Sequence, residues 1–450
     1  MKITEYPAIT CDSRTVTPGA LFIAVRGKND DGNKYAEAAL AAGAADVVST
    51  DRHGLAMMAD EYYGHPSGKL KLVGITGTNG KTTTVTLLYR LFRSLGYECG
   101  LLSTIANYVG TRRTETTNTT SDPITINRLL AEMVEAGCEY CFMEVSSIGV
   151  EQERIAGLEF AVGIFSNLTH DHLDYHGTFD EYLRCKKLFF DGLPAGATAI
   201  TNADDRNGMI MLQNTAARKV SYSCHTGADH CCKILEQSFE GMLLRIDGTE
   251  VSTRLIGQHN AYNLLAIYST AVELGADRNE VMLAISTLGS APGRLENISG
   301  PRGLSVIIDY AHTPDALENV LKTLRAVAPE RELVCLFGCG GDRDRTKRPE
   351  MAAIAEKLAD RIFITSDNSR TERTEDIIED IKKGLGAEGL RKTVCISDRR
   401  EAIRSAIMFS PEDSTILLAG KGHEDYQIIG TEKRHFDERE IVAETFETLA

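Results

Sequence analysis

The chain is poor in the features that mark disordered, fibrous or membrane-spanning proteins. Its 450 residues include only 11 prolines and 39 glycines, and 42% are hydrophobic and 25% charged, which is the composition of a globular protein. No stretch approaches the roughly 18 consecutive apolar residues of a membrane span. The start, MKITEYPAITCDSR, lacks the basic and apolar regions of a signal peptide. We therefore expect a cytoplasmic protein without membrane insertion.

The chain also lacks an excess of basic residues. Its formal net charge of −15 argues against nucleic acid or an anionic membrane surface as a partner. Anionic substrates must then be bound by local basic sites. Neither Cys231-Cys232 nor the pair Cys335 and Cys339 has zinc-ligand spacing with histidine partners, so we expect the 11 cysteines to be reduced thiols.

The length is too great for one hydrophobic core, because cores stop growing at about 250–300 residues. Apolar runs such as ALFIAV, LKLVGIT, YCFMEV and RELVCLFG alternate with helical patterns such as KYAEAALAAGA, which ends at Gly43, and PITINRLLAEMVEAG. A turn-rich segment at 65–68 and Pro292-Gly293 mark two boundaries, and there is no internal repeat or low-complexity tract. The pattern predicts an α/β protein with mostly parallel sheets. Its three predicted domains are residues 1–68, 69–291 and 292–450.

A glycine-rich loop lies between the predicted strand LKLVGIT and a predicted helix, which is the context that a phosphate-binding loop requires. The loop is Gly77, Thr78, Asn79, Gly80, Lys81, Thr82 and Thr83. Strict Walker spacing would place glycine where Ile75 stands, and the nearest glycine is Gly74, so the loop is a variant. We expect Lys81 to reach the β- and γ-phosphates of ATP and Thr82 to ligate Mg²⁺.

Carboxylates and imidazoles follow the next predicted strands. Glu144 closes the strand YCFMEV at a sheet end, where its best use is as an oxygen ligand for Mg²⁺. Asn167 ends the following strand and leads into THDHLD, which contains His172. A capping box, TFDE, then opens the helix EYLRCKKLFF with Lys186 and Lys187, two lysines that helical periodicity does not distinguish.

Several longer motifs carry a resemblance to a known family. GTNGKTT, EVSS, NLTHDHLDYHG, EYLRCKKLFF, APGRLE, DYAHTPDAL, GGDRDRTKRPEM, DNSR and GKGHEDYQIIG occur in the order seen in Mur ligases. CDSRTVTPGALFIAVRG resembles the uridine-nucleotide domain of that family, so the resemblance covers essentially the whole chain. It implies a UDP-sugar-binding domain at 1–68, a central ATP-binding P-loop domain at 69–291 and a Rossmann-like, amino-acid-binding domain at 292–450.

The resemblance implies an ATP- and Mg²⁺-dependent ligase of peptidoglycan precursor synthesis. The terminal carboxylate of UDP-N-acetylmuramoyl-L-alanyl-D-glutamate would become an acyl phosphate, and the amine of meso-diaminopimelate would attack it to form an amide. A monomer without a nucleic-acid partner is expected.

Individual roles follow from the same resemblance. Catalytic and metal-binding roles would fall to Lys81, Thr82, Glu144, His172 and Lys186, the last as a carbamylated lysine. Besides the loop and Asn167, nucleotide contacts would be Arg294, His312, Asp315 and Lys347. Contacts of the UDP-muramoyl dipeptide would be Ser13, Arg14, Thr119, Thr120, Ser146 and Arg154. The incoming amino acid would meet Arg343, Asn368, Arg370, Gly420 and Glu424.

The sequence departs from the family pattern at site-like positions. Ile148 replaces the histidine of EVSSH, Ser369 replaces the proline of DNPR, and the usual Thr-Thr-Pro is extended around Asp122. The first domain is also short. Other functions consistent with the motifs are the same reaction with L-lysine, a ligase like folylpolyglutamate or cyanophycin synthetase, and a non-catalytic paralogue that binds a UDP-sugar.

Overall fold

The computed structural model describes residues 2–27, 31–116, 118–169, 173–225 and 227–449. The chain is an α/β protein, as the sequence predicts, and it divides into two compact units. The first unit comprises Met1–Leu168, Tyr175–Cys232 and Tyr262–Ile285, and the second comprises Thr169–Asp174, Lys233–Ala261 and Ser286–Ala450.

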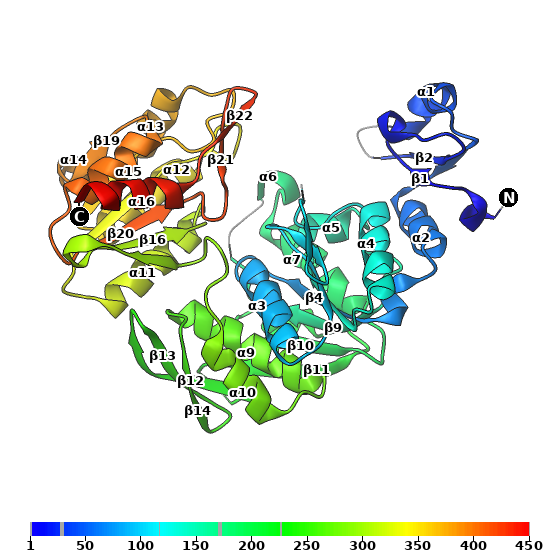
Figure 1. The fold of residues 1–450 in the computed structure, drawn as a ribbon, viewed down its shortest axis with the longest axis horizontal. Coiled ribbons are helices and arrows are strands. Elements are labelled where there is room, and N and C mark those ends of the chain that lie inside the picture. The colour runs from blue at the N-terminus through cyan, green and yellow to red at the C-terminus, as the bar shows by residue number, and fades with distance from the viewer. Residues whose placement is uncertain (1, 28–30, 117, 170–172, 226, 450) are drawn as a thin grey trace. The chain divides into compact units, whose positions relative to one another are not determined.

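A small parallel sheet begins the first unit (Figure 1). Its strands are β1 (Ile9–Thr10), β2 (Leu21–Val25) and β3 (Asp46–Thr50), and its helices are α1 (Ala36–Ala41) and α2 (Arg52–Tyr62). The apolar side chains of β2 alternate between two faces, because successive residues of a strand point to opposite sides. Leu21 and Ile23 pack with Leu55 of α2, whereas Phe22 packs with Ala39 of α1. The predicted strand ALFIAV and the helix ending at Gly43, whose φ is 105°, are therefore confirmed.

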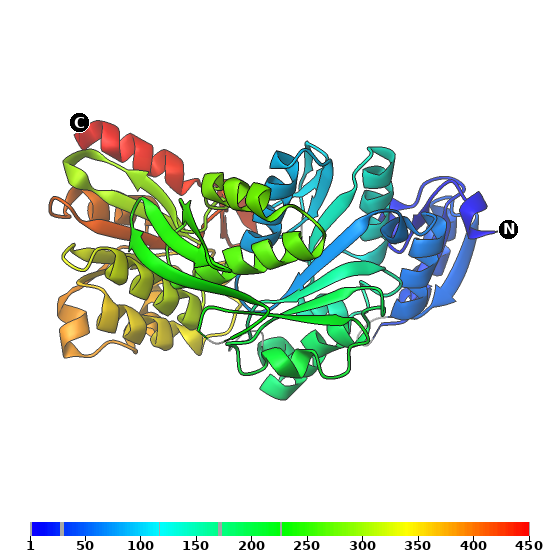
Figure 2. The same cartoon turned by 90° about the horizontal axis from the view of Figure 1, so that it is seen from below.

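A large sheet follows in the chain. Its strands are β4 (Lys71–Thr76), β5 (Cys99–Leu102), β6 (Asn107–Val109), β7 (Arg112–Thr114), β8 (Tyr140–Glu144), β9 (Phe160–Phe165), β10 (Thr198–Asn202), β11 (Arg218–Ser223), β12 (His230–Ser238), β13 (Gly241–Ile246) and β14 (Thr249–Thr253). Their order is β14-β13-β12-β11-β10-β9-β4-β8-β5-β6-β7. The strands from β12 to β5 pair in parallel, and β6, β7 and the hairpin β13–β14 add antiparallel edges (Figure 2).

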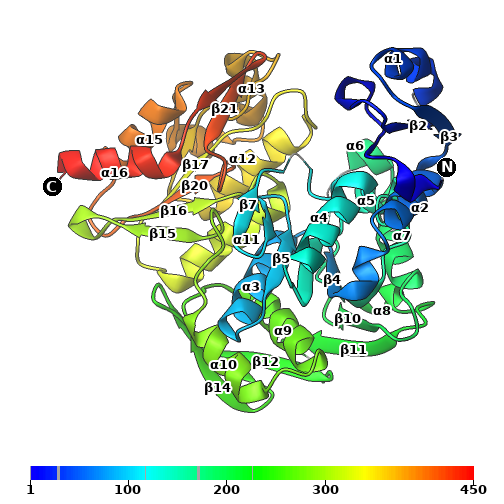
Figure 3. The same cartoon turned by 45° about the vertical axis from the view of Figure 1, so that its right-hand side comes forward.

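Among the described residues, six helices lie between strands of this sheet in the chain. They are α3 (Lys81–Ser94), α4 (Pro123–Glu135), α5 (Ser147–Glu151), α6 (Leu173–His176), α7 (Phe179–Asp191) and α8 (Gly208–Met211). Helices α9 (Gln258–Glu273) and α10 (Arg278–Thr287) follow its last strand, β14. Helix α3 begins after the loop that follows β4 and packs on β8 and β5 (Figure 3). Since β4, β8 and β9 are parallel neighbours, their carboxyl ends bring the glycine-rich loop, Glu144 and Asn167 to one edge of the sheet.

The second unit is built around a six-stranded sheet of order β15-β16-β20-β17-β18-β19, in which only β15 is antiparallel. The strands are β15 (Glu296–Ser299), β16 (Ser305–Asp309), β17 (Leu333–Phe337), β18 (Arg361–Ile364), β19 (Thr393–Cys395) and β20 (Thr415–Ala419). A separate hairpin joins β21 (Tyr426–Ile429) to β22 (Glu432–His435).

Helices cover both faces of the six-stranded sheet (Figure 1). They are α11 (Pro314–Val327), α12 (Lys347–Leu358), α13 (Thr374–Lys382), α14 (Ala387–Arg391), α15 (Arg399–Met408) and α16 (Glu438–Leu449). Helices α11, α12 and α13 pack with one set of alternate strand residues, and α15 and α16 pack with the other. This is the helix-covered, mostly parallel sheet that the sequence predicts for the last domain.

The sequence also predicts a chain without membrane insertion and with reduced cysteines. In the part of the chain that the structure describes, no helix is long and apolar enough to cross a membrane. All the cysteines lie in that part and carry free thiols.

Candidate active site

The glycine-rich loop after β4 is held in a shape that side chains would disrupt. Gly77 has a φ of 152° and Gly80 a φ of 88°. A Cβ on Gly77 would lie 1.9 Å from Ser166 Oγ, and one on Gly80 would lie 2.5 Å from Asn263 Oδ1. The variant spacing has a packing cause, because Ile75 is buried inside β4 and a Cβ on Gly74 would meet the ring of Phe160 at 2.7 Å. Gly74 is therefore required by the packing of β4, and the glycine-rich loop begins at Gly77.

Asn167, at the end of β9, fixes the middle of the loop. Asn79 N–H donates to Asn167 Oδ1 over 2.9 Å, and Asn167 Nδ2 donates to Asn79 O over 3.1 Å. Thr78 N–H donates to Asn167 O over 2.8 Å. Lys81 Nζ folds back to donate to Gly77 O at 2.9 Å and Thr78 O at 2.8 Å, so its charge lies directly at the loop. Thr83 follows in the first turn of α3 and is buried.

Glu144 lies fully buried at the end of β8, beside the first turn of α3. Its Oε2 accepts from Thr82 Oγ1 over 3.0 Å, and its Oε1 accepts from Thr104 N–H over 2.8 Å. A buried carboxylate next to a hydroxyl presents two hard oxygen donors of the kind that Mg²⁺ prefers. Among the described residues, no group of three His, Cys, Asp or Glu side chains is arranged to hold a metal ion. The predicted ligand His172 lies outside the described residues.

Helix α7 separates the two lysines that the sequence leaves equivalent. Lys186 is buried, with 1% of its surface exposed, and its Nζ donates to Gly77 O over 2.8 Å. The same Nζ lies 4.6 Å from the ring centroid of Tyr182. Lys187 instead pairs with Asp191 over 2.6 Å. Lys186 is thus the lysine that reaches the glycine-rich loop.

Four predicted substrate contacts gather around the carboxyl end of β8. Thr120 Oγ1 donates to Glu144 O over 2.9 Å and accepts from Ser146 N–H over 2.9 Å. Thr119 Oγ1 accepts from Thr104 Oγ1 over 3.1 Å. Arg154 NH1 donates to Thr120 O over 2.5 Å, and burial lowers the pKa of this guanidinium.

Next to this group, Ile148 stands in α5 where the family pattern has histidine. An imidazole nevertheless reaches the same turn, because His176 Nε2 lies 2.9 Å from Ser147 Oγ. His176 comes from α6 and is buried.

The other two predicted substrate contacts are in the first domain. Ser13 and Arg14 form a short 3-10 turn capped by Asp12. Arg14 pairs with Asp12 over 2.7 Å, and this side-chain contact lowers the pKa of Asp12 to about 2. The hydrogen bonds of Arg14 to Asp12 stay within this turn.

Three of the four predicted nucleotide contacts of the second unit gather around Tyr310. The Arg294 guanidinium lies 4.8 Å from the Tyr310 ring centroid, and the His312 ring lies 4.7 Å from it. Lys347 Nζ donates to His312 O over 2.9 Å. Asp315, in the first turn of α11, accepts from Thr169 over 3.2 Å, and burial raises the pKa of its carboxyl.

The five residues predicted to meet the incoming amino acid also come together in the second unit. Arg370 NH1 donates to Gly341 O over 2.9 Å, and a Cβ on Gly340 would lie 3.0 Å from Arg370 NH1 and 3.6 Å from Arg343 Cγ. Asn368 Nδ2 donates to Glu424 Oε2 over 3.0 Å. Gly420, with a φ of 116°, lies beside Asp367. Burial raises the pKa of Glu424, and the nearby Asp367 adds to this shift while Lys421 opposes it.

Backbone hydrogen bonds support the loop that contains Ser369, although the proline of the family pattern is absent. Arg370 N–H donates to Ile428 O over 3.2 Å, and Gly430 N–H donates to Arg370 O over 2.8 Å. These bonds pair Arg370 with the hairpin strand β21 in place of the rigidity that proline would give.

Three residues of these clusters were missed by the sequence interpretation. Asn263 of α9 lies against Gly80, Tyr182 OH lies 3.1 Å from Thr78 Oγ1, and Lys421 contacts Asn368 and Glu424. Only Asn263 carried a usable signal, since it is a polar residue in the otherwise apolar run NLLAIY.

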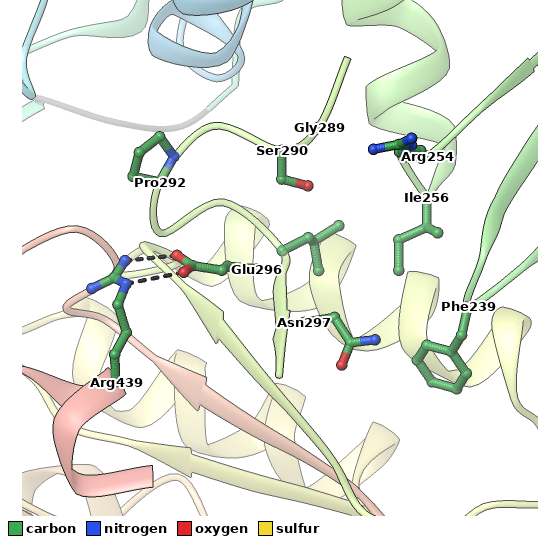
Figure 4. A pocket seen from close by; sticks show the side chains of 10 residues that line it. Phe239, Arg254, Ile256, Gly289, Ser290, Pro292, Glu296, Asn297 and Arg439 are labelled. Carbon is green, nitrogen blue, oxygen red and sulfur yellow. Dashed lines mark hydrogen bonds and ion pairs between the residues drawn. The ribbon is translucent and has the colours of Figure 1, made fainter. Parts of the chain in front are cut away.

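A separate cavity of about 480 Å³ lies in the second unit (Figure 4). Phe239, Ile256 and Pro292 supply apolar surface, and Arg439 pairs with Glu296 at its rim. None of the predicted site residues lines this cavity.

The chain matches three domain descriptions of one family. They are "Mur ligase family, catalytic domain" over residues 5–67, "Mur ligase middle domain" over 75–271 and "Mur ligase, glutamate ligase domain" over 293–422. The chain therefore belongs to the Mur ligase family, a class of ATP-dependent, amide-bond-forming ligases.

Within the family, the chain is similar to ligases of one kind. It is 50% identical to the UDP-N-acetylmuramoyl-L-alanyl-D-glutamate--2,6-diaminopimelate ligase of Parabacteroides distasonis, over 98% of this chain and 94% of the relative. The ligase of the same name from Bacillus cereus is 39% identical over 98% of this chain and 94% of the relative. A solved structure of a ligase of this name has a TM-score of 0.70 at 32% identity, covering 99% of this chain and 95% of its own.

Proposed function

We propose that the chain is an ATP-dependent ligase that adds meso-diaminopimelate to UDP-N-acetylmuramoyl-L-alanyl-D-glutamate in cytoplasmic peptidoglycan precursor synthesis. The observation that carries the proposal is the cluster of Arg370, Asn368 and Glu424, which offers a cation, an amide and a carboxylate in one place. Such a set complements the amino acid end of diaminopimelate, which carries a carboxylate and an ammonium group. The 50% identity to a diaminopimelate ligase supports the same substrate.

The chemistry forms one amide at the expense of one ATP. An oxygen of the D-glutamyl carboxylate attacks the γ-phosphorus, which gives an acyl phosphate and ADP. The amine of diaminopimelate attacks the acyl carbon, so the amide forms and phosphate and a proton leave. Lys81 and the loop N–H groups stabilise the negative charge on the phosphates during the first step.

The residues at the loop fit a bound Mg²⁺ in part. The Thr82 hydroxyl and the Glu144 carboxylate supply oxygen ligands, and His172 and a carbamate on Lys186 are the predicted remainder from the protein. When bound, Mg²⁺ neutralises phosphate charge and orients the transferred group. A carbamate forms when a neutral lysine amine takes up CO₂ and loses a proton. The position of Lys186 Nζ at Gly77 O, 2.8 Å away in the loop that carries Lys81, supports this proposal.

The remaining assignments follow the domain ranges 1–68, 69–291 and 292–450, which we propose as the UDP-sugar, ATP and amino-acid domains. Ser13 and Arg14 then meet the uridine diphosphate. Thr119, Thr120, Ser146 and Arg154 meet the muramoyl dipeptide, and their grouping beside Glu144 supports this. Arg294, His312, Asp315 and Lys347 are proposed nucleotide contacts. A monomer is sufficient for these roles.

The test is phosphate release by the purified chain with ATP and Mg²⁺. We expect release only when both UDP-N-acetylmuramoyl-L-alanyl-D-glutamate and meso-diaminopimelate are present, with one amide formed per phosphate. Release that needs a folate or a cyanophycin primer, or binding of the UDP-sugar without turnover, would overturn the proposal in favour of the two alternative classes.

A further inference from the structure

Lys421 is the most deeply buried cation of the amino-acid cluster. It follows Gly420 after β20, and its side chain has 0% of its surface exposed. Its Nζ lies 3.1 Å from Glu424 Oε2, 3.2 Å from Asn368 Oδ1 and 3.4 Å from Asp367 Oδ1. Lysine is almost never fully buried unless it is paired, so these three oxygens explain how its charge is tolerated.

The lysine fixes which way the Asn368 amide points. Asn368 Oδ1 accepts from Lys421 Nζ and from Ile428 N–H, the latter over 2.9 Å. Both neighbours can only donate, so the oxygen must face them. The Nδ2 group is therefore directed to Glu424 Oε2. Without Lys421, this amide would lose one of the two donors that select its orientation.

Lys421 also favours the ionised form of Glu424. Burial raises the pKa of Glu424, Asp367 raises it further, and Lys421 is the cation that opposes both. Burial raises the pKa of the Tyr310 and Tyr426 phenols, and the negative charge of Glu424 adds to that shift. Asp367 is buried as well, and Lys421, Arg399 and His312 hold its pKa below the ordinary value. Lys421 is thus the one of these cations that also contacts Glu424.

We propose that Lys421 is a positioning residue for the amino-acid substrate: it holds Asn368 and Glu424 in place and lies beside Glu424 as its counter-charge, so that the side chain is oriented for the ammonium group of diaminopimelate. This inference rests on the proposed function. Lys421 acts through its two neighbours and does not itself contact the substrate. Under this proposal, the affinity for diaminopimelate depends on buried Lys421. The chemistry at the glycine-rich loop does not depend on it.

The experiment measures KM and kcat of Lys421→Met for all three substrates at pH 7 and pH 9. We expect the KM for diaminopimelate to rise at least about tenfold at pH 7, which corresponds to one lost hydrogen bond to a charged group. The KM values for ATP and the UDP-muramoyl dipeptide should stay within about twofold of the wild type, since Lys421 contacts neither loop nor nucleotide cluster.

The pH dependence has a definite sign. Glu424 is neutral below its pKa, and loss of Lys421 raises that pKa further, so the carboxylate is neutral up to a higher pH. Any part of the weakening that comes from protonation of Glu424 should therefore grow as the pH falls. Lys421→Arg, which keeps the charge, should restore part of the affinity for diaminopimelate.

Lys433→Met is the matched control. Lys433 is exposed and lies 4.0 Å from the Tyr426 ring centroid, but it is on the far strand of the hairpin, and it should leave all three KM values unchanged. Equal rises of KM for all three substrates, or an unchanged KM for diaminopimelate, would overturn the inference. A wild-type chain that does not use diaminopimelate would instead overturn the proposed function.

A double variant tests whether Lys421 acts through Glu424, and Lys421→Arg takes the place of Lys421→Met in both backgrounds if the latter does not fold. Lys421→Met combined with Glu424→Gln removes both charges of the Lys421–Glu424 pair. Because Lys421 acts through both Glu424 and Asn368, Lys421→Met should raise the KM for diaminopimelate less in the Glu424→Gln background than in the wild type. An equal rise in both backgrounds would contradict the mechanism.

Discussion

Thr82 and Glu144 lie 62 positions apart in the sequence, yet Thr82 Oγ1 donates to Glu144 Oε2 over 3.0 Å. The contact joins the start of α3 to the end of β8, two elements that the parallel pairing of β4 with β8 brings together. It places a hydroxyl and a carboxylate, the two proposed oxygen ligands of Mg²⁺, at the same loop that carries Lys81. Substitutions at this loop therefore test the proposed nucleotide site directly.

Lys81→Ala should abolish ligation and leave the fold intact. The lysine supplies a positive charge at the loop, where its Nζ contacts Gly77 O and Thr78 O, and the proposed role is to stabilise the phosphates. We expect the rate at saturating ATP to fall below a tenth of the wild-type rate, with an unchanged circular dichroism spectrum. Retention of more than a tenth would exclude this role for Lys81.

Gly80→Ala should weaken ATP binding through a defined clash. Its Cβ would lie 2.5 Å from Asn263 Oδ1, and its φ is 88°. Gly96→Ala is the control, because Gly96 has a φ of 93° but nothing within 4 Å of the added Cβ. Both variants bear the backbone cost of about 1–2 kcal/mol, so only Gly80→Ala should raise the KM for ATP. Equal effects on that KM would show that the approach of Asn263 does not matter.

Lys186→Ala should be inactive, whereas Lys187→Ala should keep most of the activity. Lys186 Nζ contacts the phosphate loop at Gly77 O, and Lys187 contacts Asp191 of its own helix. If Lys186 carries a carbamate, a short carboxylic acid should partly restore Lys186→Ala by supplying the missing anion. Mass spectrometry of the active enzyme with bound ligands should show the added CO₂, and a free amine there would refute the carbamate.

The sequence predicted most of the strands because parallel strands are buried on both faces and read as continuous apolar runs. YCFME of β8 and LVCLF of β17 are buried at every position. Apolar patterning could not decide between Lys186 and Lys187. Adjacent lysines on one helix differ only in their tertiary contacts, which the sequence pattern does not show. Lys421 was missed for the same reason, since two of its three partners, Asp367 and Asn368, come from a segment more than 50 positions away.

Glu438→Gln should destabilise the second unit. Arg399 and Glu438 form an ion pair over 2.8 Å in which both side chains have 0% exposure. Breaking a buried pair leaves a charge without its partner and costs about 3–5 kcal/mol. Glu444→Gln is the control, since Glu444 and Arg400 are 50% and 35% exposed, and such surface pairs contribute about 0–1 kcal/mol. Urea unfolding of the full chain should show a large shift for Glu438→Gln alone, and similar shifts for both would contradict the argument.

Arg370 should make the chain prefer meso-diaminopimelate to L-lysine. The two amino acids differ by one carboxylate at the far end, and a guanidinium binds a carboxylate through two parallel hydrogen bonds. Gly341 O and the pairing with β21 hold Arg370 in one position. Its side chain therefore loses little conformational freedom when the substrate binds. A site specific for L-lysine would leave the Arg370 guanidinium without a carboxylate to bind.

The size of the preference follows from the same contact. Hydrogen bonds to charged groups contribute about 1.5–3 kcal/mol each, so one two-bond pair supplies a preference of roughly a hundredfold or more in kcat/KM. Competition between the two amino acids in a ligation assay measures it. Arg370→Ala should remove most of the preference, and Arg373→Ala, at an exposed arginine three positions on, should not. Equal use of the two amino acids by the wild type, or a preference for lysine, would refute the assignment of the substrate.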